Sequence, residues 1–255
     1  MIHLVIYILL STQGFLPVPI EGMQAEKVYC DHLDNVYIIE ANRLEKYNAD
    51  FELQAVYDYQ TSGVITTVDV SNPLRILVYS ANANEVLFLD KQMSTIGNPV
   101  LLDEIGYYDV SAVCSATRGG FWLHDAQSQQ IVNIDQHGNA GLTASVSERF
   151  SGLPNQLYEK NNKLFLGFEE QGIMVYNVMG AYETSFPVKY QKNFKIINQN
   201  ILYLKNNTLF SFDYFLLKEL SLFHNAFEIQ DFAVNKNTLY YVQEGTIHIS
   251  DLQLR

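Results

Sequence analysis

A short apolar strand motif recurs six times along the chain at nearly constant spacing. Successive copies begin 40, 45, 43, 37 and 38 residues apart. They are VYII at 36–39, ILVY at 76–79, FWLH at 121–124, LFLG at 164–167, ILYL at 201–204 and LYYV at 239–242. A period of about 40 residues is typical of an architecture in which one supersecondary unit is repeated.

Each copy is followed by a polar turn and a second strand, at 43–47, 85–90, 130–135, 172–178, 208–213 and 246–250. Most units have a further strand before this pair, at 64–71, 110–116, 194–198 and 231–235, and several have one after it, at 53–59, 183–189 and 218–223. Four strands in about 40 residues are the pattern of a propeller blade. We therefore predict an all-β chain, a six-bladed β-propeller of four-stranded antiparallel blades. Its innermost strands should begin near residues 27, 64, 110, 155, 193 and 229.

Other all-β architectures fit this period less well. A β-sandwich does not require six equal units, and the coils of a β-helix are much shorter. The chain has 17 Tyr and 15 Phe residues, and aromatic residues favour half-buried strands. No apolar period of 3.6 residues persists over three turns, so few helices are expected.

The sixth unit ends after TIHISDL at 246–252 and lacks a fourth strand of its own. Residues 15–22 (FLPVPIEG) precede the first blade and could supply it. Pro17 and Pro19 are two residues apart, so in a strand both would turn their missing N–H toward the same edge, which suits an outermost strand. We predict that 15–22 closes the ring by pairing with 246–252. The alternative is a disordered tail or a part of the export signal.

The N-terminus resembles an export signal. Residues 2–10 (IHLVIYILL) form a short apolar run, and Thr12-Gln13-Gly14 offers a small-x-small cleavage pattern. The run has about half of the roughly 20 residues that a membrane-spanning helix needs. We predict a signal peptide at 1–14, a single propeller domain at 15–255, a periplasmic or extracellular location, and no transmembrane segment after signal removal. Because the run lacks a basic flank, a buried first strand or a misassigned start codon is the alternative.

The charge of the chain argues against a nucleic acid partner. It has 28 acidic and 16 basic residues, which give a formal net charge of −12. Such a surface repels phosphate backbones and anionic lipid headgroups. The expected partner is therefore a protein or a glycan.

Two elements of the sequence carry a resemblance to known proteins. They are Val68-Asp69-Val70-Ser71-Asn72-Pro73, and the stretch from Trp122 through Asp125 to Ile134-Asp135. With their surroundings at 64–93 and 110–139, they resemble a family of uncharacterised exported propeller proteins of Bacteroidota-type bacteria. The resemblance covers about 24–180 well and the last two blades loosely. It implies a fold and a compartment but no activity. More distantly, the blades resemble six-bladed propellers of the NHL and gluconolactonase type.

No catalytic or metal-binding motif stands out, and no cofactor or metal is predicted. The histidines are isolated from one another and from cysteine, and His124-Asp125 has no serine in a nucleophile elbow to serve. Cys30 and Cys114 fall on the first strands of blades one and three. Because these blades are not neighbours in a ring, we expect both thiols to be unpaired.

Two hypotheses of function use the segments that lead into the innermost strands. Carboxylates and amides from several blades could meet at the channel mouth and bind a divalent cation, as in a lactonase-like metal-dependent hydrolase. The residues in question are Glu26, Asp109, Asn155, Asn193 and Glu228. In the other hypothesis the same face is a binding surface centred on Tyr107 and Tyr108, because tyrosine is enriched at interaction hot spots.

Tyr59 and Tyr190 would enlarge this binding surface if they were exposed. Strand alternation suggests that one of Tyr107 and Tyr108 instead packs between blades. We interpret the chain as a non-enzymatic extracytoplasmic propeller that binds a protein or glycan partner in the cell envelope, with the hydrolase as the alternative. The candidate binding residues are Tyr107, Tyr108, Asp109, Asn155, Asn193 and Glu228.

Overall fold

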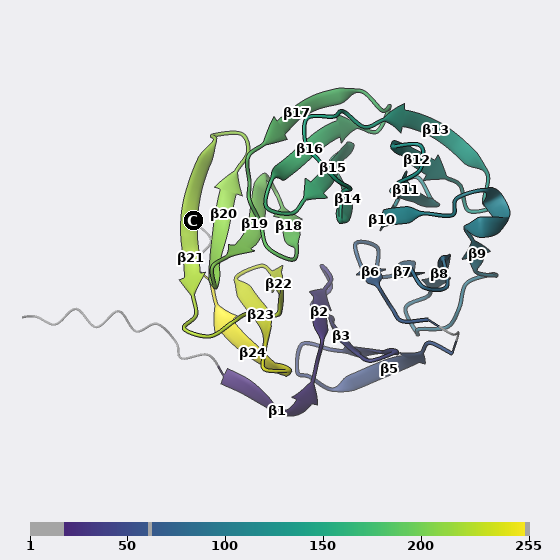
Figure 1. The fold of residues 1–255 in the computed structure, drawn as a ribbon. Coiled ribbons are helices and arrows are strands. Elements are labelled where there is room, and N and C mark those ends of the chain that lie inside the picture. The colour runs from purple at the N-terminus through teal and green to yellow at the C-terminus, as the bar shows by residue number, and fades with distance from the viewer. Residues whose placement is uncertain (1–17, 61–62, 253–255) are drawn as a thin grey trace, which may run out of the picture.

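Six four-stranded antiparallel sheets are arranged in a ring (Figure 1). The computed structural model describes residues 18–60 and 63–252. Their only helical element is one 3₁₀ turn, η1 (Asp103–Ile105). No helix in this part of the chain has the length and hydrophobicity that a membrane crossing requires. The predicted six-bladed propeller is therefore confirmed, whereas the predicted signal peptide at 1–14 lies outside the described residues.

In five blades the strands follow one another from the channel to the rim in chain order. Blade 1 contains β2 (Lys27–Cys30), β3 (Val36–Glu40), β4 (Arg43–Tyr47) and β5 (Leu53–Asp58), and blade 2 contains β6 (Thr67–Asp69), β7 (Ile76–Ser80), β8 (Glu85–Leu89) and β9 (Val100–Leu101). Blade 3 contains β10 (Val110–Ser115), β11 (Phe121–Asp125), β12 (Gln130–Ile134) and β13 (Ala140–Ser145), and blade 4 contains β14 (Gln156–Lys160), β15 (Lys163–Phe168), β16 (Gly172–Asn177) and β17 (Tyr182–Phe186). Blade 5 contains β18 (Phe194–Ile197), β19 (Asn200–Lys205), β20 (Thr208–Asp213) and β21 (Lys218–His224).

Blade 6 is assembled from both ends of the described chain. Its inner strands are β22 (Asp231–Asn235), β23 (Thr238–Gln243) and β24 (Thr246–Asp251), and its outermost strand is β1 (Val18–Gln24). β1 runs antiparallel to β24, with Val18 opposite Ile249 and a register shift before Gln24. The predicted closure of the ring by residues 15–22 is therefore confirmed for 18–22, the part that the structure describes, and the strand continues to Gln24. Pro19 lies opposite His248 in this edge strand, and Pro17 lies outside the described residues.

The described residues form six hydrophobic core clusters, each of which lies between two neighbouring blades. In β7, Ile76 and Val78 belong to the cluster shared with blade 1, and Leu77 and Tyr79 to the cluster shared with blade 3. Because side chains alternate between the faces of a strand, a strand buried on both faces must be apolar at every position. This explains why the second strands appear in the sequence as continuous apolar runs.

A recurring turn, here called the outer turn, joins the third and fourth strands. In blades 1 to 4 five residues separate the last paired residues of these strands, and the first of the five is Asn48, Asp90, Asp135 or Asn177. Its Oδ1 accepts the backbone N–H groups two and four residues ahead at 2.7–3.1 Å. The fourth residue has a positive φ, from 58° to 83°. This Asx turn explains the Asp or Asn at the end of each third strand.

Candidate functional site

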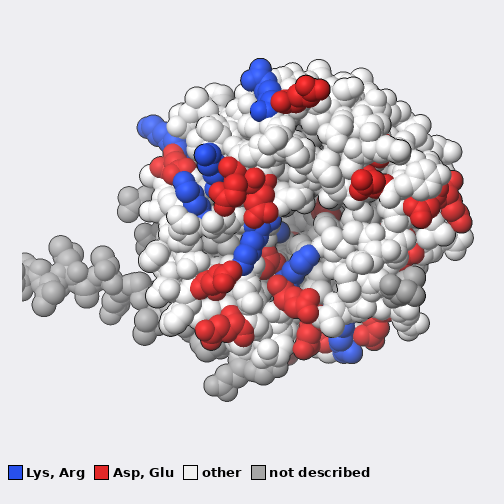
Figure 2. All heavy atoms as spheres, viewed as in Figure 1, with Lys and Arg blue, Asp and Glu red and all other residues white. Residues whose placement is uncertain are grey.

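The six innermost strands surround a channel of about 590 Å³ at the centre of the ring (Figures 1 and 2). Acidic and basic side chains both reach the hollow in this face (Figure 2). Each innermost strand contributes to the wall, for example through Lys27, Thr67, Val113, Gln156, Lys195 and Asp231. The volume falls within the range of about 300–1,000 Å³ that is usual for small-molecule sites.

Polar side chains at the start of the innermost strands hold neighbouring blades together. Asp231 Oδ2 accepts the backbone N–H of Val28 at 2.9 Å and thereby links blade 6 to blade 1. Gln156 links blade 4 to blade 5, because its amide donates to the carbonyl of Phe194 at 2.9 Å and accepts the N–H of the same residue at 3.0 Å. These bonds satisfy backbone groups that face the channel. Part of the polar lining is therefore structural.

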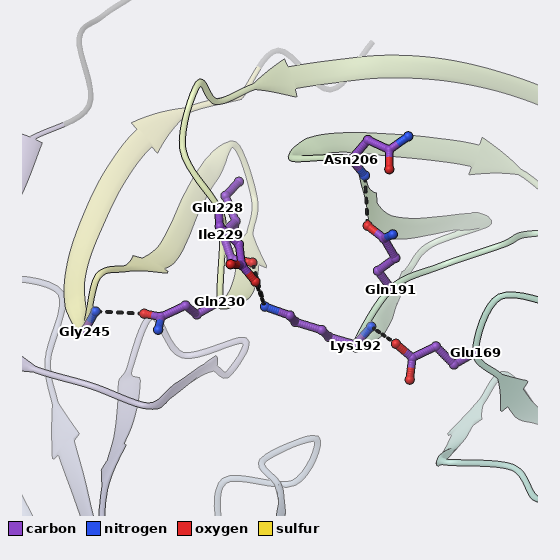
Figure 3. Close-up of polar contacts among 8 residues, drawn as sticks. All are labelled: Glu169, Gln191, Lys192, Asn206, Glu228, Ile229, Gln230 and Gly245. Atoms are coloured by element: carbon purple, nitrogen blue, oxygen red, sulfur yellow. Dashed lines mark hydrogen bonds and ion pairs between the residues drawn. The ribbon is translucent and has the colours of Figure 1, made fainter.

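Side chains of the lead-in segments, which precede the innermost strands, cap turns in four blades. In each case a side-chain oxygen accepts the backbone N–H fifteen residues ahead, in the turn between the second and third strands. The pairs are Glu26 with Ala41 at 3.3 Å, Thr66 with Ala81 at 2.9 Å, Gln191 with Asn206 at 2.9 Å and Gln230 with Gly245 at 2.7 Å. The last two are drawn in Figure 3. Glu26, a candidate metal ligand, thus belongs to a repeated capping pattern.

Lys192 connects three blades at the channel mouth (Figure 3). Its ammonium forms an ion pair with Glu228 at 2.6 Å, and its backbone N–H donates to Glu169 at 2.9 Å. The hydrogen bond and charge of Lys192 lower the pKa of Glu228. Asn155 lies beside this group, where its amide donates to Glu169 at 3.3 Å and accepts the hydroxyl of Tyr190.

Asn193 and Asp109 lie apart from this group. The Asn193 amide donates to Asp231, and its Oδ1 is buried with no hydrogen-bond donor among the described residues. Asp109 is exposed, and its backbone carbonyl accepts the N–H of Ala126 at 2.8 Å. Within residues 18–60 and 63–252, no three His, Cys, Asp or Glu side chains form a group that could bind a metal ion. The candidate ligands from the sequence are therefore placed around the mouth, and four of the five have structural partners.

The four tyrosines considered for a binding face have different environments. Tyr107 packs against the apolar cluster between blades 2 and 3, whereas Tyr108 is 67% exposed. Tyr59 and Tyr190 are both buried, so the condition under which they would enlarge the surface is not met. Tyr59 donates its hydroxyl to Glu85 at 2.6 Å, and the ring of Tyr190 packs edge-on against Phe194.

The cysteines and the buried histidine are not positioned to act on a ligand together. Cys30 and Cys114 are free thiols, as predicted, and they belong to different interblade clusters. His124 is fully buried, and its Nδ1 lies 2.8 Å from Ser111 Oγ. Its Nε2 has no hydrogen-bond partner among the described residues. Burial lowers the pKa of His124 to about 4, against the opposing effect of Asp125 and Asp109.

One exposed apolar turn was not anticipated from the sequence. In blade 5 the last paired residues are Asp213 and Lys218, so four residues rather than five separate them. Within this outer turn Phe215, Leu216 and Leu217 are 77%, 59% and 67% exposed. The sequence signal is the run of three large apolar residues between Asp213 and Lys218, where the other outer turns have at most two in succession.

The channel lysines were also missed by sequence reasoning. Lys27 and Lys195 alternate with the buried residues Val28 and Ile196 on β2 and β18. A charged residue next to buried apolar residues in a predicted innermost strand was the available signal.

No protein-family model matches the sequence, and no curated protein matches it. Several solved structures are similar in fold. A streptogramin B lyase structure has a TM-score of 0.65 at 10% identity, covering 93% of this chain and 97% of that one. BamB from Moraxella catarrhalis has a TM-score of 0.55 at 10% identity, covering 89% and 83%. A chain of a mitotic checkpoint complex has a TM-score of 0.64 at 11% identity, covering 99% of both. At such low identity the likeness shows the fold alone, and these propellers differ widely in function.

Proposed function

We propose that this chain is a non-enzymatic propeller of the cell envelope that binds a protein partner through the outer turn of blade 5. The varied functions of the similar propellers are compatible with a binding scaffold. The apolar run at 2–10 supports the proposal of export to the periplasm or beyond. The fourth strand of a blade begins at the outer turn and leads to the lead-in segment of the next blade, so these two segments lie on opposite faces of the ring. Tyr108 and Asp109, in the lead-in segment of blade 3, are proposed as a secondary contact region on the face opposite the outer turns.

The observation that carries the proposal is a comparison among the outer turns. Phe51 and Met93 occupy the positive-φ position in blades 1 and 2, and both fold back onto the interblade clusters. The corresponding residue of blade 5, Leu217, also has a positive φ, of 55°, yet remains exposed. A large apolar side chain in a left-handed conformation on the surface contributes nothing evident to folding. Exposed apolar clusters of this kind mark interaction sites.

Asp213 and Tyr214, at the start of this outer turn, hold it in place. Asp213 Oδ1 accepts the backbone N–H groups of Phe215 and Leu216 at 2.9 and 2.8 Å. Tyr214 packs its ring against Phe165 and Phe186, with centroids 5.8 Å away in both cases. A preorganised turn loses little conformational entropy when a partner binds.

An apolar cleft on a protein fits this turn better than a glycan. Sugar rings are recognised largely by hydrogen bonding and aromatic stacking, and two of the three exposed side chains are leucines without polar atoms. The single Trp of the chain, Trp122, is buried and donates to Glu159 at 2.7 Å. A protein partner that buries three apolar side chains near the centre of its interface would make this turn a hot spot.

The test is a triple variant, Phe215→Ser, Leu216→Ser and Leu217→Asn. Its free energy of unfolding should match wild type within about 1 kcal/mol, because exposed substitutions have small effects and asparagine tolerates a positive φ. We expect the affinity for a protein captured from the native envelope by the wild-type chain to fall at least tenfold, as measured by titration of the purified partner.

The matched control is Phe227→Ser, which removes an exposed aromatic residue from the lead-in segment of blade 6. This variant should bind as wild type does. Equal affinity of the wild type, the triple variant and the control would contradict the proposed docking turn, and so would the lack of any saturable protein partner.

A thermal scan with and without calcium tests the alternative of a metal-dependent hydrolase. Because Glu26, Asn155, Asn193 and Glu228 are occupied by turn caps, amide bonds and an ion pair, we expect calcium to shift the melting temperature by no more than about 2 °C. A rise of about 10 °C that is lost in an Asp109→Ala variant would favour the hydrolase instead.

A further inference from the structure

We propose that the central channel binds a small oxyanion, a carboxylate or phosphate group, on Lys195 with support from Lys27 and Tyr158. This site lies at the centre of the ring, between the innermost strands, whereas the outer turn of blade 5 joins the two outermost strands of that blade. Its ligand is independent of the protein partner proposed above.

The channel wall is more positive than the protein as a whole. Five lysines and four acidic residues line it, which gives the wall a formal charge of +1 in a protein of net charge −12. The lysines are Lys27, Lys160, Lys192, Lys195 and Lys236, and the acidic residues are Glu26, Asp31, Asp69 and Asp231. Lys192 and Lys236 pair with Glu228 and Asp34. Lys27, Lys160 and Lys195 are therefore the wall lysines without an ion pair among the described residues, and these can attract a small anion.

The acidic side chains of the wall are already engaged as hydrogen-bond acceptors. Asp31 accepts the hydroxyl of Tyr37 at 2.8 Å and two backbone N–H groups of its own turn. Asp69 accepts the N–H of Ser115 at 2.8 Å, which links blade 2 to blade 3. Asp231 makes the equivalent link to blade 1, and Glu26 caps its turn. These bonds fix the positions of the carboxylates but leave their charges, and Asp231 attracts both Lys195 and Lys27.

Lys195 differs from two other channel lysines, Lys192 and Lys27. Lys192 pairs with Glu228 at 2.6 Å, and Lys27 donates to the carbonyl of Thr66. The Lys195 ammonium lies 4.8 Å from the centroid of the Tyr29 ring and makes no hydrogen bond or ion pair with the described residues. A cation–π contact holds the ammonium in place but leaves its three N–H donors free for a ligand.

Lys27 supplies the second positive charge. Burial lowers the pKa of Lys27, Asp231 raises it, and the neighbouring Lys195 lowers it again. Two ammonium groups that repel each other in a confined channel are stabilised together when an anion lies between them. Asp231 brings one negative charge to these two ammonium groups, so a bound anion would supply the second.

Tyr158 offers a neutral donor to the same cavity. It lines the channel from β14, and its hydroxyl has no hydrogen bond to the described residues. Burial, followed by the charge of Asp69, raises its pKa, so the hydroxyl keeps its proton at neutral pH. Lys195, Lys27 and Tyr158 thus offer two ammonium groups and one hydroxyl to the same cavity, and donors of these kinds bind carboxylates and phosphates.

The test uses inorganic phosphate and D-glucuronate as probes, with glucose as an uncharged match for glucuronate and sodium chloride to hold the ionic strength constant. We expect at least one oxyanion to raise the melting temperature saturably and glucose to have no effect. In the Lys195→Gln variant the apparent dissociation constant for that anion should rise at least tenfold, since a charged donor is lost. Response to phosphate alone, or to glucuronate alone, identifies which group the channel prefers.

The matched control is Lys205→Gln, which removes the same charge from an exposed position of the same blade outside the channel wall. It should bind the anion as the wild type does. If Lys195→Gln does not fold, Tyr158→Phe replaces it and should weaken binding severalfold. Equal responses to oxyanions and chloride, or equal losses in Lys195→Gln and Lys205→Gln, would overturn the proposal, as would unchanged binding in both channel variants.

Discussion

Deletion of residues 1–24 is expected to lower the melting temperature by about 10 °C or to prevent folding altogether. The deletion removes β1, and with it the pairing to β24 and the contacts of Ile20 and Met23 with the cluster between blades 6 and 1. Two half-buried side chains of this size contribute about 3 kcal/mol, a large part of a typical free energy of unfolding of about 5–15 kcal/mol. The deletion also leaves the edge of β24 unpaired, so aggregation should increase.

A deletion of residues 1–14 is the matched control, because it leaves every described strand in place. It should unfold at the same temperature as the full chain. A synthetic peptide of residues 15–24 should restore the stability of the longer deletion in a concentration-dependent manner, because a segment that binds only the folded state stabilises that state. Identical melting curves for the two deletions would show that β1 does not stabilise the ring.

Acidification from pH 7 to pH 4 is expected to destabilise the protein by about 3 kcal/mol through His124 alone. In the folded state burial lowers the pKa of this side chain from 6.5 to about 4. The unfolded chain therefore binds a proton between these values that the folded chain does not. The contribution of His124 to the free energy of unfolding is fully present above pH 6.5. It decreases as the pH falls through this window and decreases no further below about pH 4. The structural cause is that a charged imidazole would carry an N–H at Nε2 with no acceptor.

Urea unfolding of wild type and a His124→Gln variant at pH 7 and pH 4.5 measures this effect. Carboxylate contributions are common to both proteins and cancel in the difference, so the variant should lose less stability on acidification by about 2–3 kcal/mol. His137→Gln removes an exposed histidine from the outer turn of blade 3 and should keep the pH dependence of the wild type. The same pH dependence in all three proteins would rule out His124 as its source.

The blades could be predicted from the sequence because their second strands are buried on both faces. Such strands must be apolar throughout, so VYII at 36–39 and LYYV at 239–242 stand out without reference to any partner. The outer strands β9 (Val100–Leu101) and β13 (Ala140–Ser145) were not predicted. One has two residues and the other is mostly small and exposed, and a strand at a solvated edge needs no apolar pattern.

The candidate site was harder to predict, because its residues acquire their roles from other blades. Glu26 and Asn155 are polar residues before strands, and the sequence alone does not distinguish a turn cap from a ligand. Tyr190 appeared suitable for a surface, yet it packs against Phe194 and donates to Asn155, which lies 35 residues earlier. Lys195 is notable only once the ring places it beside Tyr29, two blades away.

The pairing of β1 with β24 also sets the order in which the fold can be completed. Val18 meets Ile249, so the first strand of the described chain has no partner until almost the last residues have been synthesised. Each of blades 1 to 5, by contrast, has all four strands within one continuous stretch of chain. Five complete blades can therefore emerge from the ribosome before the ring is able to close. Closure is then a late, long-range and slow step. A chain carried across a membrane during its synthesis would reach the other side still open.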